Sequence, residues 1–269
     1  MAREDARYLA IAAGLRDRIK NGVYPAGTNL PRRVDLMREF GASRALVDSA
    51  VGVLEAEGLV WAVPHKGTEV RYGMTRQRRP RGNVVKRNTA TDSPGYSFPA
   101  ATGTEVWHHH ITPTATVVPL EDERLARMLG VPEGSPVLRR HRVTGPVTEP
   151  PFEICDTWIH PDAASEVPEV ANQDPGPGGW LARIETAGHW PISWMEFHRA
   201  RLPTRAEAEE LQIPLSVPVL EIVRVGRSGK TGKPVEVTQY VIPSDRVETV
   251  QPLERDESAQ TPWSDVLGT

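Results

Sequence analysis

The chain has 269 residues, 39% of them hydrophobic and 25% charged, which is typical of a soluble globular protein. This length exceeds the usual size of one domain, so we expect two domains with separate cores. The N-terminus lacks the pattern of a secretory signal, and a single cysteine, Cys155, excludes a disulfide within the chain. No run reaches the roughly 18 apolar residues that a membrane span needs. These features predict a cytoplasmic protein.

Charge is divided unevenly along the chain. Residues 1–87 contain 17 Lys and Arg against 9 Asp and Glu, a net charge of +8, whereas the remainder contains 15 against 26, a net charge of −11. A basic N-terminal third favours a polyanionic partner, because Lys and Arg neutralise the phosphates of a nucleic acid. Chance clustering of surface charge is the alternative interpretation.

The N-terminal part of the chain has the pattern of three helices followed by a hairpin. Apolar residues recur at spacings of three and four in three segments, which predicts helices with one buried stripe. The third segment begins at Ser43, whose hydroxyl suits a helix N-cap. Two β-rich runs separated by a basic tip then predict a hairpin that forms a wing. The helices are expected at residues 8–20, 32–40 and 43–58, and the hairpin at 59–63 and 68–71 with its tip at 64–67. Residues 1–73 are therefore predicted to form a winged helix-turn-helix.

The rest of the chain divides into a linker, a larger domain and a tail. Residues 74–104 have no apolar period and alternate basic residues with Pro, Gly, Thr and Ser, so we expect a flexible basic linker. Residues 105–250 contain a repeat in which a helix-strand-turn-strand pattern recurs after 82 residues for the first strand and 83 for the second. Two such halves predict one antiparallel sheet with helices on one side, an α+β arrangement. Residues 251–269 are left as a C-terminal tail.

A set of N-terminal residues follows the pattern of a known family. These residues are Tyr8, Leu15-Arg16, Ile19, Gly22, Pro25, Gly27, Leu30-Pro31, Phe40-Gly41, Ser43-Arg44, Val47, Leu54, Glu57-Gly58-Leu59-Val60 and Gly67-Thr68. The pattern resembles the GntR family of bacterial regulators, and residues 104–250 resemble the UTRA effector domain of its HutC-type branch. The resemblance implies a winged helix-turn-helix joined to an effector-binding and dimerisation domain with a chorismate-lyase-like antiparallel sheet. Arg32-Arg33, Asp48, Val63 and His65 depart from the family pattern, which affects the operator sequence inferred from relatives and not the fold.

The expected DNA contacts lie on the second helix of the helix-turn-helix and on the wing. That helix enters the major groove at its N-terminus, so Arg44 is the first candidate for a base or phosphate contact. A solvated surface arginine is the alternative for Arg44. Asp48, one turn later, either accepts from a cytosine amine or pairs with Arg44, and we favour the pairing. The complete set of expected DNA-binding residues is Arg32, Arg33, Ser43, Arg44, Asp48, His65, Lys66 and Gly67.

The expected effector contacts lie on one face of the sheet. Alternate residues of a strand share a face, so Arg140 and Arg142 point the same way, and guanidinium groups suit a carboxylate or phosphate. The resemblance assigns an anionic effector to arginines of this strand and orients it with a glutamate of the paired strand. The residues implied are Arg140, Arg142, Glu153, Glu236 and Tyr240. The alternative is that Arg142 and Arg224, at equivalent repeat positions, form structural ion pairs with the two glutamates.

Other chemistry finds little support in the sequence. In His108-His109-His110, consecutive strand residues point to opposite faces and no nearby ligand set completes a metal site, so we expect no metal and no cofactor. We find no nucleophile elbow or phosphate-binding glycine loop and expect no enzyme. We expect a homodimeric repressor that binds double-stranded operator DNA, meets no membrane and is released by a small anionic metabolite, a sugar phosphate or carboxylate. The alternatives are a constitutive DNA-binding protein whose larger domain only dimerises, and an enzyme built on that domain.

Overall fold

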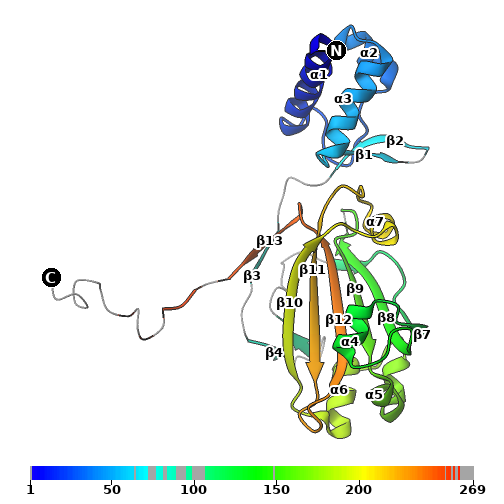
Figure 1. Cartoon of the computed structure of the whole chain (residues 1–269), viewed down its shortest axis with the longest axis vertical. Helices are drawn as coiled ribbons and strands as arrows, with labels where there is room; N and C mark the ends of the chain where they lie inside the picture. The colour runs from blue at the N-terminus through cyan, green and yellow to red at the C-terminus, as the bar shows by residue number, and fades with distance from the viewer. Residues whose placement is uncertain are drawn as a thin grey trace, which may run out of the picture.

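The computed structural model describes residues 2–63, 65–71, 77–80, 84–88, 95–98, 107–147, 149–251, 253–255, 257 and 260. A small helical domain lies at one end of the molecule, and a large sheet with helices packed on it forms the other end (Figure 1). Within these residues, no helix is long and apolar enough to cross a membrane.

The N-terminal domain has three helices and a hairpin. They are α1 (Ala2–Lys20), α2 (Arg33–Phe40), α3 (Arg44–Ala56), β1 (Val60–Val63) and β2 (Gly67–Val70). Gly41 ends α2 with a φ of 55°, a left-handed conformation that glycine adopts without steric cost. Ser43 caps α3 by accepting a hydrogen bond from the backbone N–H of Leu46 at 3.5 Å. Leu15 and Leu54 are fully buried in the core between the helices. The predicted winged helix-turn-helix is confirmed.

The C-terminal domain is built on a seven-stranded antiparallel sheet. Its strands are β6 (Trp107–His109), β7 (Thr114–Pro119), β8 (Pro136–Pro146), β9 (Glu153–Ile159), β10 (Ser193–Arg201), β11 (Val219–Arg227) and β12 (Pro234–Pro243). Their order is β10-β11-β12-β9-β8-β6, and β7 also pairs with β8. The β8–β9 hairpin of the first repeat meets the β11–β12 hairpin of the second where Thr157 lies opposite Thr238. The two repeats therefore form one sheet, as predicted.

Helices cover both faces of this sheet. On one side, which we call the α4/α7 face, two helices pack on residues such as Val223 and Val241. On the other side, the α6 face, four short helical segments pack on Leu138 and Ile159. The helical segments are α4 (Glu123–Leu129), α5 (Pro161–Glu166), η1 (Pro168–Ala171), α6 (Gly179–Ile184), η2 (Glu185–His189) and α7 (Arg205–Leu211). The sequence predicted helices on one side only, because segment 160–192 between the repeats has no counterpart in the repeat pattern.

Most of the described residues of the predicted linker lie in paired strands. Strand β3 (Gln77–Pro80) pairs in parallel with β13 (Val247–Val250), and β4 (Lys86–Asn88) pairs with β5 (Gly95–Ser97). Aromatic side chains at 96 and 98 pack against the hydrophobic cluster of the α6 face. These segments differ from the expected flexible linker, because the two aromatic residues gain burial on the larger domain. The rest of 74–104, and most of the predicted tail, lie outside the described residues.

A buried carboxylate joins several strands on the α4/α7 face. The Glu221 carboxylate is fully buried and accepts hydrogen bonds from Arg124 Nη1 at 2.7 Å, Gln239 Nε2 at 2.7 Å and Arg201 Nε at 2.8 Å, and also from Arg199. Burial raises the pKa of Glu221, but the hydrogen bonds from Arg199, Arg201 and Gln239 outweigh it and hold that pKa at about 2. This carboxylate therefore stays charged and ties β10, β11, β12 and α4 together.

A histidine links the same face to α7. His141 Nδ1 lies 2.8 Å from Asp156 Oδ1, and His141 Nε2 lies 3.5 Å from Glu210 Oε1. Hydrogen bonds to Asp156 and then to Glu210 raise the pKa of His141 to about 9. Arg139 also donates to Asp156, from Nε at 2.6 Å. At neutral pH the imidazolium of His141 therefore connects β8 and β9 to α7.

We predict that the free energy of unfolding falls as the pH rises from about 7 towards about 10. The pKa of His141 is about 9 in the folded chain and about 6.5 in an unfolded chain. The contribution of its ion pairs to the free energy of unfolding is therefore full below about pH 6.5 and is lost as the pH rises through the folded-state pKa, a difference of up to about 3 kcal/mol. Urea unfolding at a series of pH values measures this slope.

His141→Gln should lose most of the slope, whereas His65→Gln, which changes an exposed wing residue, should keep it. Equal slopes in wild type and His141→Gln would contradict the assignment.

Candidate functional site

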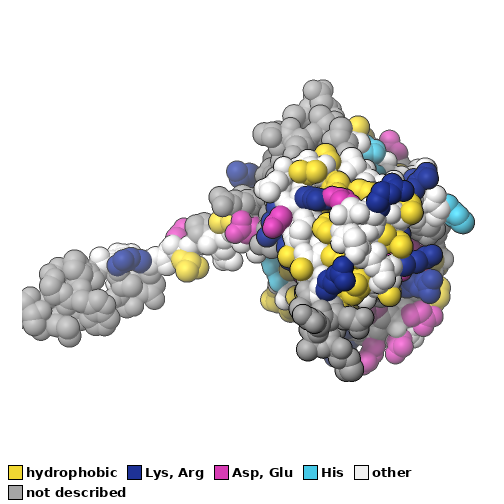
Figure 2. Space-filling model, turned by 90° about the horizontal axis from the view of Figure 1, so that it is seen from above, with side chains coloured by type: hydrophobic (Ala, Val, Ile, Leu, Met, Phe, Trp, Pro, Cys, Tyr) yellow, Lys and Arg dark blue, Asp and Glu magenta, His cyan; other side chains and the backbone are white. Residues whose placement is uncertain are grey.

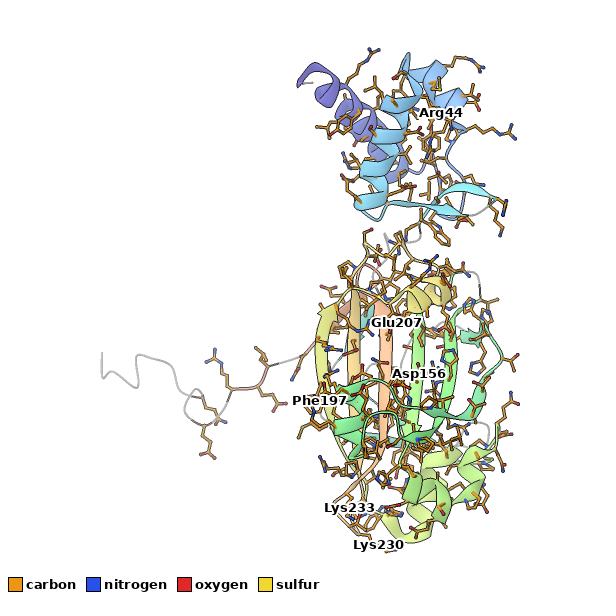
Figure 3. All side chains as sticks on the ribbon, turned by 45° about the vertical axis from the view of Figure 1, so that its right-hand side comes forward. Arg44, Asp156, Phe197, Glu207, Lys230 and Lys233 are labelled. Carbon is orange, nitrogen blue, oxygen red and sulfur yellow. The ribbon has the colours of Figure 1, made fainter. Side chains whose placement is uncertain are left out.

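The N-terminal end of α3 is exposed and carries Arg44, whose side chain is 78% accessible. Figure 3 places Arg44 at the opposite end of the molecule from Lys230 and Lys233. Arg44 Nε lies 3.6 Å from Asp48 Oδ2, which is the pairing favoured from the sequence. The sequence did not predict that Arg33 Nε also donates to Asp48 Oδ1, at 2.9 Å.

The remaining predicted DNA contacts surround this helix end. Arg32 is the exposed residue that precedes α2, and the hydroxyl of Ser43 is engaged in capping α3. At the wing tip His65, Lys66 and Gly67 are all exposed. The backbone N–H of Lys66 donates to the carbonyl oxygen of Val63 at 3.0 Å, and His65 has a φ of 63°. Seen from this end of the molecule, Lys and Arg side chains are spread over the surface (Figure 2).

The five predicted effector residues all lie on the α6 face of the sheet. Strand register shows why: Arg142 and Tyr240 both lie opposite Cys155, so the three form one row across β8, β9 and β12. Arg140, Glu153 and Glu236 are each separated by an even number of positions from the member of this row on their own strand. Residues at even spacing along a strand share a face, so these three lie on the same side of the sheet. The sheet thus combines residues from both repeats.

The two arginines of β8 have different surroundings. Arg142 is exposed, and its charge interacts with Cys155, Tyr240 and Glu153. Arg140 instead donates to three backbone carbonyls of the segment that follows β9 and α5. The accepting oxygens are those of Val170 at 2.6 Å, Asn172 at 2.7 Å and Gln173 at 2.9 Å. Arg140 therefore holds this segment on the sheet, and these contacts use the guanidinium that the sequence assigned to an anion.

An ion pair is buried in the second repeat. Arg224 Nε lies 3.7 Å from Glu236 Oε1, and both side chains are at most 4% exposed. Glu236 Oε2 also accepts a hydrogen bond from Thr238 Oγ1 at 2.6 Å. Burial raises the pKa of Glu236 and raises that of Tyr240 to about 12, so the phenol of Tyr240 is neutral at physiological pH. The ion-pair alternative therefore describes Arg224 and Glu236.

Aromatic residues that were not predicted from the sequence complete this region. Phe98 lies over Arg224, with its ring centre 3.5 Å from Cζ, and contacts Trp194 edge to face at 5.1 Å. Tyr96 packs on the same indole at 5.3 Å. The sequence pattern that could have indicated them is the spacing of Tyr96 and Phe98, two aromatic residues two positions apart in an otherwise polar segment.

Two clefts flank the sheet at other positions. One, of about 550 Å³, lies between α4 and α7 and is lined by Arg139, Arg199 and Trp158 among others. The second, of about 490 Å³, lies between the β4–β5 hairpin and α6 and is lined by Tyr96 and Glu185. The five predicted effector residues line neither of these two clefts. In the part of the chain that is described, no three His, Cys, Asp or Glu side chains are grouped as a metal site requires.

Comparison with known proteins agrees with both domains. Residues 7–70 match the model of bacterial regulatory proteins of the gntR family, and residues 108–248, just over half of the chain, match the UTRA domain. The chain is 29% identical over 234 residues to an HTH-type transcriptional regulator of Streptomyces coelicolor, which covers 85% of this chain and 86% of the relative. It is 29% identical over 245 residues to another from Rhizobium meliloti, covering 90% and 93%.

A solved structure supports the same fold. A crystal structure described as a GntR-family transcriptional regulator superposes with a TM-score of 0.54 and 24% identity, covering 93% of this chain and 98% of that chain. Two family models in the expected order and two relatives aligned over most of their length agree with it. The chain therefore belongs to the GntR family of bacterial transcriptional regulators, with a DNA-binding domain followed by a UTRA effector domain.

Proposed function

We propose that this regulator is a homodimeric repressor of the HutC-type branch that leaves its operator when a small anion binds the α6 face. GntR-family domains bind operator DNA and UTRA domains bind small-molecule effectors. Because the partner is chromosomal DNA, we infer a cytoplasmic location. The observation that carries the proposal is a buried contact between the two domains.

That contact joins the end of β2 to the end of β12. Arg71 is only 4% exposed, and its Nη1 donates to Asp245 Oδ2 at 2.8 Å and to the carbonyl oxygen of Gly58 at 2.9 Å. Asp245 follows β12, the strand that carries Glu236 and Tyr240. A ligand that favours one position of β12 would therefore act, through Asp245 and Arg71, on Gly58, which follows α3.

The effector is proposed to bind through Arg142. This guanidinium is exposed on the α6 face beside Glu153 and Tyr240, and its planar donors suit a carboxylate or a phosphate. A carboxylate or a sugar phosphate is therefore the expected class. We reassign Arg140 to positioning, since its donors are occupied by carbonyls of η1 and of the two residues that follow it.

DNA is proposed to bind at the N-terminal end of α3 and at the wing. Arg44 would reach base edges or phosphates, while Arg32 and the wing residues His65, Lys66 and Gly67 would contact phosphates. The N-terminal amides of α3, which follow Ser43, favour a phosphate in the same place. The Asp48 carboxylate limits the charge that Arg33 and Arg44 offer to DNA.

A second copy of the chain is proposed to pack on the edge of the sheet. Strand β10 is the terminal strand in the sheet order, and Met195 and Phe197 on it are 62% and 37% exposed. Figure 3 places Phe197 on this outer strand. Two copies would present two DNA-binding domains to paired half-sites about one helical turn apart, which strengthens binding without new contacts.

Asp48→Asn should bind non-specific DNA several-fold more tightly and with a steeper salt dependence, by about one unit of log K against log salt. The carboxylate that neutralises Arg33 and Arg44 is removed, so both become available to phosphates. Anisotropy titrations of a duplex of random sequence over a salt series measure both quantities.

Glu123→Gln is the matched control, because it makes the same charge change on an exposed residue of α4 and should leave DNA affinity unchanged. If Asp48→Asn leaves non-specific binding unchanged and weakens only the operator, Asp48 reads a base and the charge-limiting role is wrong.

The ligand-released repressor is tested by operator titration with and without sugar phosphates and small carboxylates at millimolar concentration. At least one compound that raises the melting temperature should weaken operator binding by roughly 5- to 150-fold, the usual range of coupling energies. Arg142→Met should lose the thermal shift. Asp245→Ala should keep the thermal shift but lose most of the effect on DNA, because it removes the carboxylate that accepts a hydrogen bond from Arg71.

If every stabilising compound leaves operator affinity unchanged, the alternative of a constitutive repressor with a dimerising domain holds instead.

A further inference from the structure

The cleft of about 550 Å³ between α4 and α7 lies on the opposite side of the sheet from the predicted effector residues, and the proposed function does not use it. Apolar residues such as Leu125 and Leu202 line it together with charged residues of β8, β9 and β10. Figure 3 labels two of its carboxylates, Asp156 and Glu207. A cleft of this size, with a few charged groups among apolar ones, is typical of a ligand site.

The ion pairs that border this cleft contain more cations than anions. The cationic side chains are Arg124, Arg139, His141, Arg199 and Arg201, and the carboxylates that they contact are those of Asp156, Glu207, Glu210 and Glu221. Within the described chain, this network therefore carries one positive charge that its own carboxylates do not balance. Glu121 and Asp122 also line the cleft, but both are exposed, so solvent and salt screen their charges.

Two arginines of the network have donors to spare. Arg139 uses Nε and Nη2 on Asp156, and Arg199 uses the same two atoms on Glu221. Among the described residues, Nη1 of neither arginine has a hydrogen-bond acceptor, and the two side chains are 35% and 43% exposed. A guanidinium held by both oxygens of a carboxylate is fixed in orientation. Each arginine therefore offers an oriented N–H donor at the cleft.

The separation of the two arginines selects the class of ligand. Asp156 lies on β9 and Glu221 on β11, with β12 between them, so the guanidinium groups that they hold are about 10 Å apart. Two charged N–H···O contacts take up about 6 Å of this distance. A single carboxylate or phosphate does not span the remainder, whereas two carboxylates joined by a short carbon chain do. The indole of Trp158 lines the same cleft and suits the apolar chain.

One side of the cleft leads to the DNA-binding domain. Glu207 of α7 lines the cleft, and the loop after α7 contacts the end of α3. In that loop, Ser216 Oγ donates to the carbonyl oxygen of Glu55 at 3.3 Å. Val217 lies against Gly58, where a Cβ would be 2.9 Å from Val217 Cγ2. A ligand that changes the position of α7 would therefore act on α3.

We propose that this cleft is a second effector site, which binds a short dicarboxylate through Arg139 and Arg199. The inference goes beyond the proposed function, because the site lies on the opposite face of the sheet from Arg142. The two sites use different arginines, so each is removed by its own substitution.

The test is calorimetric titration of the full chain with acids matched in length. The probes are succinate, glutarate, adipate and suberate, each against the monocarboxylate with the same number of carbons. We expect affinity to pass through an optimum along the dicarboxylate series. The best dicarboxylate should bind at least about tenfold more tightly than its monocarboxylate, because a hydrogen bond to a charged group contributes at least that factor.

Substitutions of the two arginines test the contacts. Arg139→Gln and Arg199→Gln should each reduce the affinity for the best dicarboxylate to that of its monocarboxylate. Arg205→Gln is the matched control, because it makes the same charge change on an exposed residue of α7 that pairs with Glu209, and it should leave binding unchanged.

Both arginine variants are expected to fold. Asp156 keeps its contact with His141 when Arg139 is replaced, and Glu221 keeps hydrogen bonds from other donors when Arg199 is replaced. The melting temperature of each variant without ligand checks this.

The effector role is tested with a duplex from the upstream region of the chain's own gene. The best dicarboxylate should change the affinity for this duplex by at least about fivefold. Arg142→Met, which removes the proposed anion contact on the α6 face, should keep both the binding of the dicarboxylate and its effect on DNA.

Three results would overturn the proposal. Equal binding of dicarboxylates and monocarboxylates, or full binding by both Arg139→Gln and Arg199→Gln, excludes the site. Loss of dicarboxylate binding in Arg142→Met assigns the ligand to the α6 face instead. Binding at the cleft without any change in affinity for the duplex excludes the effector role.

Discussion

The pairing of β9 with β12 is the constraint on which the rest of the UTRA domain depends. It joins the two repeats, and the buried hydroxyls of Thr157 and Thr238 lie 2.9 Å apart across the junction. Alternation along β8 and β12 places Arg142 and Glu236 on the α6 face and His141 on the other. A shift of the β9–β12 pairing by one residue would place Glu236 on the opposite face from Arg142. The register of the β9–β12 pairing, more than any single contact, therefore decides which charged side chains share the face proposed to bind the ligand.

The same strand connects the sheet to the DNA-binding domain. Strand β12 begins near Glu236 and leads into Asp245, which holds the buried Arg71 at the end of the winged helix. Arg71 is buried and Asp245 is partly exposed, so removing this carboxylate would leave a buried charge without its partner, which is strongly destabilising. The parallel pairing of β3 with β13 adds a second connection between the segment after the winged helix and the end of the UTRA domain. In the proposed function, the effector site and the DNA-binding domain are thus connected through β12, the strand that a bound ligand would displace.

The sequence predicted the parts of this regulator that follow a local rule. Helical periodicity and the cap at Ser43 located the winged helix, and the repeat located the strands and the face of Arg142. The sequence did not predict contacts between segments that lack helical periodicity, strand alternation or a repeat. The carbonyls that hold Arg140 follow an irregular turn, Arg33 reaches Asp48 across two helices, and the aromatic residues that dock on Arg224 lie in a segment of disordered composition. In each case the partner is fixed by packing, which no spacing along the chain records.

Coupling between the two domains is the central claim, and by thermodynamic reciprocity it can be measured without knowing the effector. Hydrogen–deuterium exchange of the full chain, with and without a duplex from its own upstream region, tests it most directly. The account predicts changed protection in α3 and the wing and also in β12, 234–243, and the turn at Asp245. Changes confined to the first 73 residues, with β12 unaffected by DNA, would contradict it.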